Sequence, residues 1–359
     1  MIDHHCHSVT LADLDDTAFA SLLTESDRLP APGTSPLDSS LGLAFRRWCP
    51  PALGLPAHAP IADYLARRHA LGPAEAARRL FAATGLSHCL VDTGLTAAAG
   101  RPLLPLSELA SLSGAQVREV VRLESVAESV DAPAARWAGA VEEALRTAAA
   151  SAVAFKSVLA YRHGLAVPAE RPSPSEVARA AATHRSGRRL TDPVLLRQLL
   201  WNAVDLGLPI QLHTGFGDPD LTLHHADPSL LTDFIRAVEP AGTPLVLLHA
   251  YPYHRQAAWL AQAFPHVYAD LGLTLSYTGP RAATVLREFL ELAPFGKLLF
   301  STDAYGLPEL HTVGAAQYRH ALSRTLADWQ SDGACTAADA ARITRLVSTE
   351  NSRRLYGLG

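Results

Sequence analysis

The sequence predicts a (β/α)8 barrel, the TIM-barrel fold, and three observations lead to this prediction. Short apolar runs of β-type composition alternate with longer Ala-, Leu- and Arg-rich stretches of helical spacing, as in repeated βα units around a parallel sheet. Eight such runs occur, which favours a closed barrel over an open sheet. The chain has 359 residues, and α/β barrels often form one domain of this length. We therefore expect residues 1–359 to form a single domain.

The first strand is expected in MIDHHCH, and a long segment at about residues 9–80 separates it from the second. This segment contains the Pro- and Ser-rich stretch SDRLPAPGTSPLDSS and then two helical pieces, and it is too long for a simple crossover. We interpret it as a helical insertion over one mouth of the barrel. A lid and a peripheral packing element are equally good interpretations of its role.

The other seven strands and the helices between them follow in order. The stretches SVDAPAARWAGAVEEALRTAAA and DPVLLRQLLWNAVDLG have the apolar spacing and acidic first turns of amphipathic helices. A second insertion, VPAERPSPSEVARAAATHRSGRRLTD, lengthens the connection after the fourth strand. The seven strands are expected in SHCLVDTG at 87–94, EVVRLES at 119–125, VAFKSVLAYR at 153–162, PIQLHTG at 209–215, PLVLLHAY at 244–251, HVYADLG at 266–272 and KLLFSTDAY at 297–305.

Composition and charge restrict the possible partners. Apolar residues make up 48% and charged residues 18% of the chain, as expected for a soluble globular protein. The net charge is −4 with no basic stripe, which argues against nucleic acid or an anionic membrane and favours a small-molecule substrate. Four cysteines lack CxxC spacing, and neither a signal peptide nor a membrane span is recognisable. We therefore expect a cytoplasmic protein. Barrels of this kind often form homo-oligomers, but the sequence selects no interface.

Several predicted strands carry polar side chains at or near their carboxyl ends. Such a side chain is costly in a buried parallel strand unless it is paired or binds a ligand. A barrel gathers the carboxyl ends of its strands around one mouth, so these residues are candidates for a shared site. They are His5, His7, Lys156, His213, His249 and Asp303.

His5 and His7 lie two positions apart in the first strand, so their side chains point to the same face, and Cys6 points away. Imidazole nitrogens with a carboxylate are typical ligands of zinc or a similar divalent transition metal, whereas sites made of oxygen alone suit calcium or magnesium. Two histidines by themselves could equally be satisfied core residues. The polar residues at the other strand ends favour a metal site. His4 faces opposite to His5 and stays unassigned.

Lys156 is unusual because it and Lys297 are the only lysines among 31 basic residues. A lysine amine loses its proton when it is desolvated, and it can then act as a base, ligate a metal, or add carbon dioxide to form a carbamate that bridges two metals. The alternative is that Lys156 reaches solvent from a strand end or pairs with Glu124 or Asp92.

The order of these residues resembles the amidohydrolase superfamily of metal-dependent barrel hydrolases. The shared features are the HxH motif, a lysine on the fourth strand, histidines on the fifth and sixth, and an aspartate on the eighth. The stretches FKSVLAYRHGL, LHTGFGDPDL, LLHAYPYHRQAAWLA, VYADLGL and NSRRLYGLG resemble one branch more closely, the amidohydrolase-related group found alone in bacteria and also fused ahead of glutamine-synthetase-like domains. The resemblance covers nearly the whole chain, is weakest through residues 9–80, and is much less specific for the reaction than for the superfamily.

The resemblance implies a role for each candidate ligand. His5 and His7 would bind the more buried metal together with Asp303. His213 would bind that metal or a second one. His249 would be a ligand of the second metal or a hydrogen-bonding catalyst.

The resemblance also implies the cofactor and leaves the number of ions open. Lys156 would be a carbamate bridge only in a binuclear site, because the related decarboxylase branch uses one metal without the lysine bridge. We expect one or two divalent ions, zinc in the first place, with Mn2+ as the alternative.

The expected chemistry is hydrolysis of an amide-type C–N bond by a metal-activated water. Asp303 would take the proton of the water and pass it to the leaving nitrogen, and His249 could stabilise the oxyanion. One alternative is a metal-dependent decarboxylase of the same superfamily. Another is a catalytically idle metal-binding module, but a structural zinc site usually has four protein ligands and needs no barrel mouth.

Cationic and phenolic side chains after the third, fourth and sixth strands would surround the mouth and suggest a carboxylate-bearing substrate, because arginine binds carboxylates bidentately. In the loop GFGDPDL, Asp218 and Asp220 could meet an ammonium group, but we favour ordinary turn chemistry there. The fusion of relatives to glutamine-synthetase-like domains suggests γ-glutamyl amides or similar compounds. The candidate substrate-binding residues are Arg122, Tyr161, Arg162, Tyr251 and Arg255.

Overall fold

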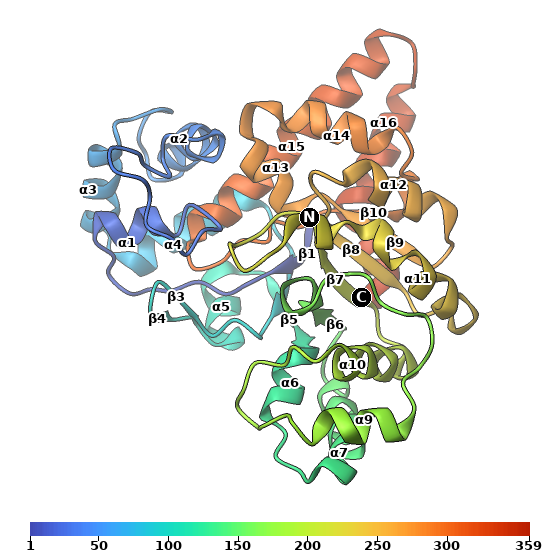
Figure 1. The fold of residues 1–359 in the computed structure, drawn as a ribbon. Coiled ribbons are helices and arrows are strands. Elements are labelled where there is room, and N and C mark those ends of the chain that lie inside the picture. Colours follow the sequence, from blue (N-terminus) through green and yellow to red (C-terminus); the bar gives the residue numbers. More distant parts are fainter.

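The computed structural model describes residues 1–359, which form a barrel of eight parallel strands with helices outside it (Figure 1). Each strand pairs with the next one of the barrel along the chain, as right-handed βα crossovers require. The eight strands are β1 Ile2–Cys6, β2 His88–Asp92, β5 Gln116–Arg122, β6 Ala154–Ser157, β7 Ile210–Thr214, β8 Leu245–His249, β9 Val267–Asp270 and β10 Leu298–Leu299.

The first and last strands close the barrel through backbone hydrogen bonds. The amide of His4 donates to the carbonyl of Phe300 at 3.2 Å, and the amide of Asp303 donates to the carbonyl of His5 at 3.0 Å. All the ladders between the eight strands are parallel, with Ile210 of β7 opposite Leu245 of β8 as one example of the register. The predicted (β/α)8 barrel is therefore confirmed.

The fourth strand is shorter than the predicted 153–162 because a side chain captures the groups that would extend it. The carboxylate of Glu124 accepts hydrogen bonds from the hydroxyl of Ser157 at 2.6 Å and from the amide of Val158 at 3.0 Å. The chain therefore leaves the sheet after Ser157, and a short helix, α8, follows over Leu159–Arg162.

The eighth strand is also shorter than the predicted 297–305. The carboxylate of Asp3 accepts hydrogen bonds from the amide of Thr302 at 2.9 Å and from its hydroxyl at 2.5 Å. The next residue, Asp303, adopts a positive φ of 50°, a conformation that regular strands exclude. This turn directs the Asp303 side chain away from the path of a continuing strand.

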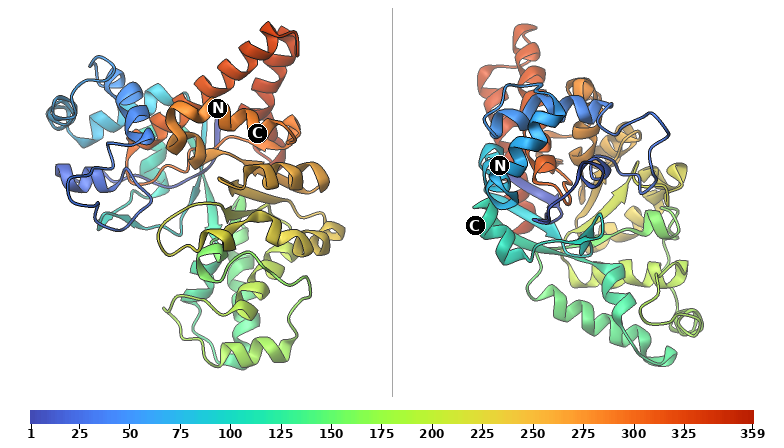
Figure 2. Two further views of the ribbon diagram at one scale, coloured as in Figure 1. Left: turned by 45° about the horizontal axis from the view of Figure 1, so that its top comes forward. Right: turned by 90° about the vertical axis from the view of Figure 1, so that its left-hand side faces the viewer.

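The helices cover the outer faces of the strands (Figures 1 and 2). The carboxylate of Asp192 caps α10 by accepting from the amides of Val194 and Leu195, and Gly207 ends this helix with a φ of 76°. Helices α5 to α17 span Leu106–Ser113, Leu123–Ser129, Ala134–Ala149, Leu159–Arg162, Pro174–Ala181, Pro193–Leu206, Thr232–Val238, His254–Ala263, Gly272–Thr278, Ala282–Leu290, Pro308–Ser331, Ala337–Arg345 and Asn351–Tyr356.

Shorter helical turns and a small hairpin complete the structure. The two strands of the hairpin, Ala97–Ala98 and Arg101–Pro102, are β3 and β4. The helical turns η1 to η6 span Leu223–Ala226, Pro228–Leu231, Glu239–Ala241, Gly279–Arg281, Phe295–Lys297 and Leu346–Glu350.

The insertion between β1 and β2 is helical, as expected, and packs beside the barrel (Figure 2). It has a core of its own in which the rings of Phe45 and Tyr64 meet with centroids 4.8 Å apart. A buried ion pair joins it to the barrel, since Arg68 Nε lies 2.8 Å from Glu309 Oε1 of α15. Its helices are α1 Asp16–Ser21, α2 Ser40–Ala52, α3 Ile61–Leu71 and α4 Pro73–Thr84.

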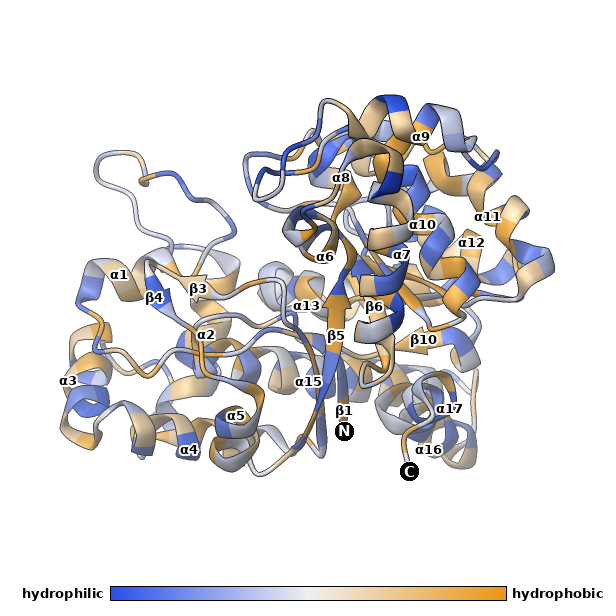
Figure 3. Ribbon diagram, turned by 90° about the horizontal axis from the view of Figure 1, so that it is seen from below, coloured by the Kyte–Doolittle hydropathy of each residue, from blue (hydrophilic) through white to orange (hydrophobic).

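The largest apolar core lies between the strands and the surrounding helices. Phe155 of β6, Leu212 of β7 and Leu247 of β8 are fully buried and belong to one apolar cluster with Leu199 and Phe234 of the helices. Figure 3 shows the hydrophobic residues of β10, with hydrophilic residues on the outer faces of the helices. None of the helices combines the length and the apolar character that crossing a bilayer would require.

Candidate metal centre

Four predicted ligands converge around the carboxylate of a fifth, Asp303. Its Oδ1 lies 2.9 Å from Nε2 of His5 and 3.5 Å from Nε2 of His7. Its Oδ2 lies 3.5 Å from Nε2 of His249, and the ring of His213 lies 4.7 Å from that of His249. Ligand atoms of His5, His249 and Asp303 fall within 4.8 Å of one another. We call this candidate site of five residues the metal centre.

The orientation of His5 and His7 is set by partners of their Nδ1 atoms. Nδ1 of His5 lies 2.8 Å from Oε1 of Gln211, and Nδ1 of His7 lies 3.2 Å from the carbonyl oxygen of Asp92. Both partners are acceptors, so each Nδ1 carries the proton and each Nε2 presents a lone pair. These lone pairs face the carboxylate of Asp303. Nitrogen and carboxylate lone pairs directed at one point are the ligand atoms of a divalent cation, so the arrangement fits a bound metal ion.

His213 and His249 are buried without hydrogen bonds that would explain their presence. They are 5% and 0% exposed, and neither Nε2 of His213 nor either ring nitrogen of His249 has a hydrogen-bond partner. An unpaired buried polar group costs roughly 1–3 kcal/mol. A metal ion would satisfy Nε2 of His213 and one ring nitrogen of His249, so both residues fit the expected cofactor.

The backbone around His249 is strained where the strand ends. His249 has a φ of 67° and Ala250 a φ of 62°. The amide of His249 donates to Oδ1 of Asp270 at 2.8 Å, and its carbonyl accepts from the hydroxyl of Thr274 at 2.6 Å. Nε2 of His4 lies 2.7 Å from Oδ2 of the same aspartate, which assigns His4 to the support of this turn.

The electrostatics of the metal centre favour the protonation states that metal ligands need. Burial lowers the pKa of His5 and of His213, and it lowers the pKa of His249 to about 3, so these imidazoles are neutral at pH 7. Burial alone would raise the pKa of Asp303, but the interactions with His249 and His5 hold it well below its usual value. Neutral imidazoles beside an ionised carboxylate form a typical ligand set for a divalent transition metal.

Lys156 lies next to the metal centre and is 2% exposed. Its Nζ is 3.2 Å from Nε2 of His5, and burial lowers its pKa. It pairs with neither of the acids considered as alternatives, because Asp92 is bound by Arg122 at 2.6 Å and Glu124 accepts from Ser157. A desolvated amine in this position is suited to ligate a metal or to form a carbamate.

The three arginines expected to bind substrate are all committed to protein carboxylates. Arg122 binds Asp92, and Gly94 leaves room for it, since a Cβ there would lie 2.4 Å from the Arg122 side chain. Nη2 of Arg162 lies 3.2 Å from Glu128. The remaining one, Arg255, is half exposed and bound by Glu291 at 2.9 Å. None of the three lines the large cavity described below.

The two tyrosines expected to bind substrate lie in different surroundings. The ring of Tyr161 packs against His213 with centroids 4.4 Å apart, so it borders the metal centre. Its hydroxyl reaches the loop after β7, where a Cβ on Gly217 would lie 1.8 Å from it. Tyr251 is half-buried and stacks on His254, with centroids 5.6 Å apart.

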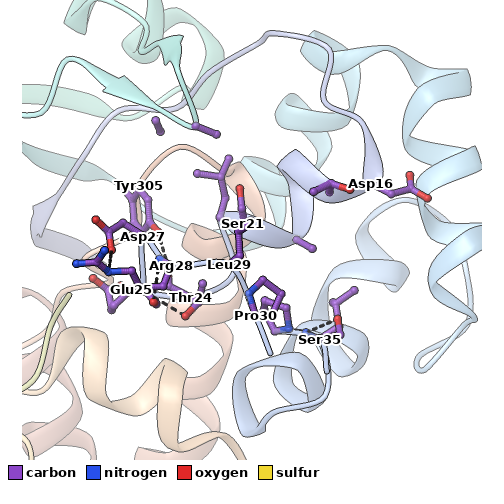
Figure 4. A pocket seen from close by; sticks show the side chains of 18 of the residues that line it. Asp16, Ser21, Thr24, Glu25, Asp27, Arg28, Leu29, Pro30, Ser35 and Tyr305 are labelled. Atoms are coloured by element: carbon purple, nitrogen blue, oxygen red, sulfur yellow. Dashed lines mark hydrogen bonds and ion pairs between the residues drawn. The ribbon is translucent and has the colours of Figure 1, made fainter. Parts of the chain in front are cut away.

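A cavity of about 1070 Å3 reaches the metal centre at His7 and Asp303. The insertion forms much of its wall, and Figure 4 shows Glu25 and Tyr305 at one end of it and Asp16 at the other. The insertion thus borders the space where a substrate would approach the metal centre, as the lid interpretation expects.

Three groups that shape the site were not predicted from the sequence. Gln211 lies two positions before His213 on the same face of a buried strand, so strand periodicity could have indicated it. The carbonyl of Asp92 is a backbone group without any sequence signal. Glu25 lies in the insertion, where the sequence carries no periodic pattern that would relate it to the barrel mouth.

Comparisons with known proteins agree with this description. The family model described as amidohydrolase matches residues 2–358. A solved structure from Lactobacillus casei, which carries the provisional name of a metal-dependent hydrolase, is 29% identical, covers 99% of this chain and 95% of its own, and superposes with a TM-score of 0.85. Uronate isomerase from Thermotoga maritima shares the fold, with 14% identity, coverage of 99% and 94%, and a TM-score of 0.62.

A curated relative is much longer than this chain. Protein fluG from Emericella nidulans is 34% identical over 223 residues, which are 57% of this chain and 26% of the fungal protein. The matched region therefore spans about a quarter of the length of that relative.

Proposed function

Because the chain belongs to the amidohydrolase family and is an enzyme of that superfamily, we propose that it hydrolyses an amide-type C–N bond of a small molecule with the help of a divalent metal. One observation carries this proposal. Lone pairs of His5 and His7 face the ionised carboxylate of Asp303 at the mouth of the barrel, an arrangement that a divalent cation would stabilise.

The residues that would hold the ion are part of the proposal. His5, His7 and Asp303 would bind the more buried position, and His213 or His249 would complete it or bind a second ion. Zinc suits this mixture of nitrogen and oxygen ligands best, and Mn2+ is the alternative. Lys156 would contribute as a carbamate only if two ions are bound.

A divalent cation in this position would supply Lewis acidity, which polarises a carbonyl group and makes water a nucleophile near neutral pH. Asp303 would accept the proton of the attacking water on a carboxylate oxygen, because this carboxylate is ionised and close to the reacting centre. It would then donate that proton to the leaving nitrogen. His249, whose nitrogens lack protein partners, could donate a hydrogen bond to the developing oxyanion.

The arginines near the mouth bear on whether the substrate carries a carboxylate. A substrate carboxylate that does not bind the metal would need a free cationic side chain at the mouth. The arginines expected to provide it, Arg122, Arg162 and Arg255, are bound to protein carboxylates. The proposed substrate is therefore defined by its amide bond and not by a carboxylate.

The proposal is tested by loading metal-free protein with zinc or manganese and supplying small amides, γ-glutamyl amides included, in parallel with aromatic carboxylic acids. Release of amine or ammonia that stops on treatment with a chelator is the expected result. Release of carbon dioxide from the acids without any amine release would contradict the proposal and favour the decarboxylase alternative.

A further inference from the structure

The charged side chains that line the cavity are mostly acidic. They comprise five carboxylates and a single arginine, Arg28. An amide substrate, as proposed above, has to place its non-reacting end against this wall. On the basis of that proposed function, we propose that Glu25 and Asp218 form a subsite that binds a cationic group, an ammonium or guanidinium, at the end of the substrate away from the scissile bond.

Glu25 is held in place by the barrel although it belongs to the insertion. The hydroxyl of Tyr277 in α13 donates to Oε1 of Glu25 at 2.9 Å. The hydroxyl of Tyr305 donates to the carbonyl of the preceding residue, Thr24, at 2.6 Å. Glu25 has no other protein partner, so its second oxygen is free to bind a ligand in the cavity.

Asp218 lies on a loop that is tied to the same wall. The ring of Phe216 packs on that of Tyr277, the partner of Glu25, with centroids 5.4 Å apart. The amide of Phe216 donates to the carbonyl of Tyr251 at 2.8 Å, which fixes the loop. The carboxylate of Asp218 accepts only from the amide of Asp220 at 2.9 Å, and no guanidinium or ammonium pairs with it.

The other three carboxylates of the cavity are paired, belong to the metal centre or lie far from the subsite. Asp27 pairs with Arg28 at 3.2 Å, so it also neutralises the only arginine of the lining. Asp303 belongs to the metal centre. Asp16 is exposed at the far end of the cavity (Figure 4). Glu25 and Asp218 are therefore the two acids of the lining that are left to bind a ligand.

Two further observations support a ligand with a positive end in this cavity. Asp303, which is 9% exposed, lines the same cavity, so the cavity opens directly onto the metal centre. In addition, burial raises the pKa of Glu25 to about 8, and the charges of Asp303 and Asp218 act in the same direction. A carboxyl group with such a raised pKa marks a place where added positive charge is stabilised.

The experiment compares two ligands of nearly equal shape, N-(4-aminobutyl)acetamide and N-pentylacetamide, which differ in a terminal ammonium or methyl group. Binding to the zinc-loaded protein is measured by isothermal titration calorimetry. We expect the cationic amide to bind about 10-fold more tightly, which is the scale of one charge-assisted hydrogen bond. Glu25→Gln keeps the shape and an acceptor for Tyr277, and it should remove most of this preference, as should Asp218→Asn.

Asp16→Asn is the matched control, because it removes a carboxylate from the same cavity outside the subsite. It should leave the preference unchanged. Equal affinities for the two amides in the wild-type protein, no measurable binding of either, or a preference that survives Glu25→Gln would each overturn the subsite.

The outcomes distinguish this inference from the proposed function. If neutral and cationic amides are hydrolysed equally well, the hydrolase proposal stands and the subsite does not exist. If the cationic amide binds preferentially but no amide is hydrolysed, the subsite stands and the hydrolase proposal fails.

Discussion

Gln211 offers a way to weaken metal binding without touching a ligand. Its Oε1 accepts from Nδ1 of His5 and so keeps the Nε2 lone pair directed at the metal centre. Replacing Gln211 with methionine removes this acceptor at similar volume. Loss of such a partner of a metal-binding histidine typically reduces metal affinity about 10- to 100-fold, and we expect a reduction of this size for zinc.

The same substitution should also reduce the stability of the fold. Nε2 of Gln211 donates to the carbonyl of His4 at 2.7 Å and contacts the hydroxyl of Tyr356 at 3.0 Å, and all these groups are buried. Leaving two such groups unpaired costs about 2–6 kcal/mol. A loss of metal affinity must therefore be separated from a loss of folded protein.

Gln317→Met is the control that separates a loss of zinc affinity from a loss of stability. Gln317 is also buried and makes two hydrogen bonds of its own, since it accepts from Trp48 Nε1 at 2.6 Å and donates to the carbonyl of Gly279 at 2.6 Å. Zinc affinity is measured by competition with a chromogenic chelator, and stability by urea unfolding. Both variants should be destabilised, but only Gln211→Met should bind zinc more weakly. Equal zinc affinities in the two variants would refute the role given to Gln211.

Three further predictions concern catalysis, pH and the insertion. Asp303→Asn should abolish turnover of any amide that the wild-type enzyme hydrolyses while circular dichroism shows an intact fold, and near-normal activity would remove Asp303 from proton transfer. In the folded, metal-free protein, the pKa of His249 is held at about 3 instead of 6.5. Between these two pH values the unfolded chain therefore binds more protons than the folded chain. Stability in the presence of a chelator should therefore fall as the pH drops from about 7 to about 5, by on the order of 1 kcal/mol per pH unit for each such histidine. A stability that rises over this range would contradict the assigned neutral state, and His249→Gln should show a shallower slope than the wild type. Arg68→Met leaves the buried carboxylate of Glu309 without its cationic partner, with only the hydroxyl of Tyr64 donating to it, and should lower the unfolding free energy by about 3–5 kcal/mol. Arg78→Met on the surface of α4 should change the unfolding free energy by no more than roughly 0.5 kcal/mol. Similar values for both variants would show that the buried pair does not hold the insertion to the barrel.

The convergence of the ligands could be predicted from the sequence because it depends on topology. The carboxyl ends of the parallel strands of a closed barrel surround one mouth, so polar residues at these strand ends lie close to one another. His5 and Asp303 are separated by nearly the whole chain, and the barrel still brings them within 2.9 Å. The family and the fold could be predicted for the same reason.

The partners of charged side chains could not be predicted in this way. Arg122 and Arg162 lie near the mouth, as expected, but each meets a carboxylate from a neighbouring element. Such pairs depend on rotamers and on loop paths, which strand periodicity does not specify. For the same reason Glu25 could not be assigned to the cavity, because its position depends on contacts between the insertion and two tyrosines. The single domain and a homo-oligomeric state stay predictions.

The shared metal ion is tested most directly by a crystal structure of zinc-loaded protein with an anomalous difference map at the zinc edge. We predict a peak in coordination contact with His5, His7 and Asp303, and a second peak only if Lys156 carries an added carboxyl group. A map without a peak at these residues, or with the ion bound elsewhere, for example at the buried group of Asp3, Cys6 and His311, would contradict the account.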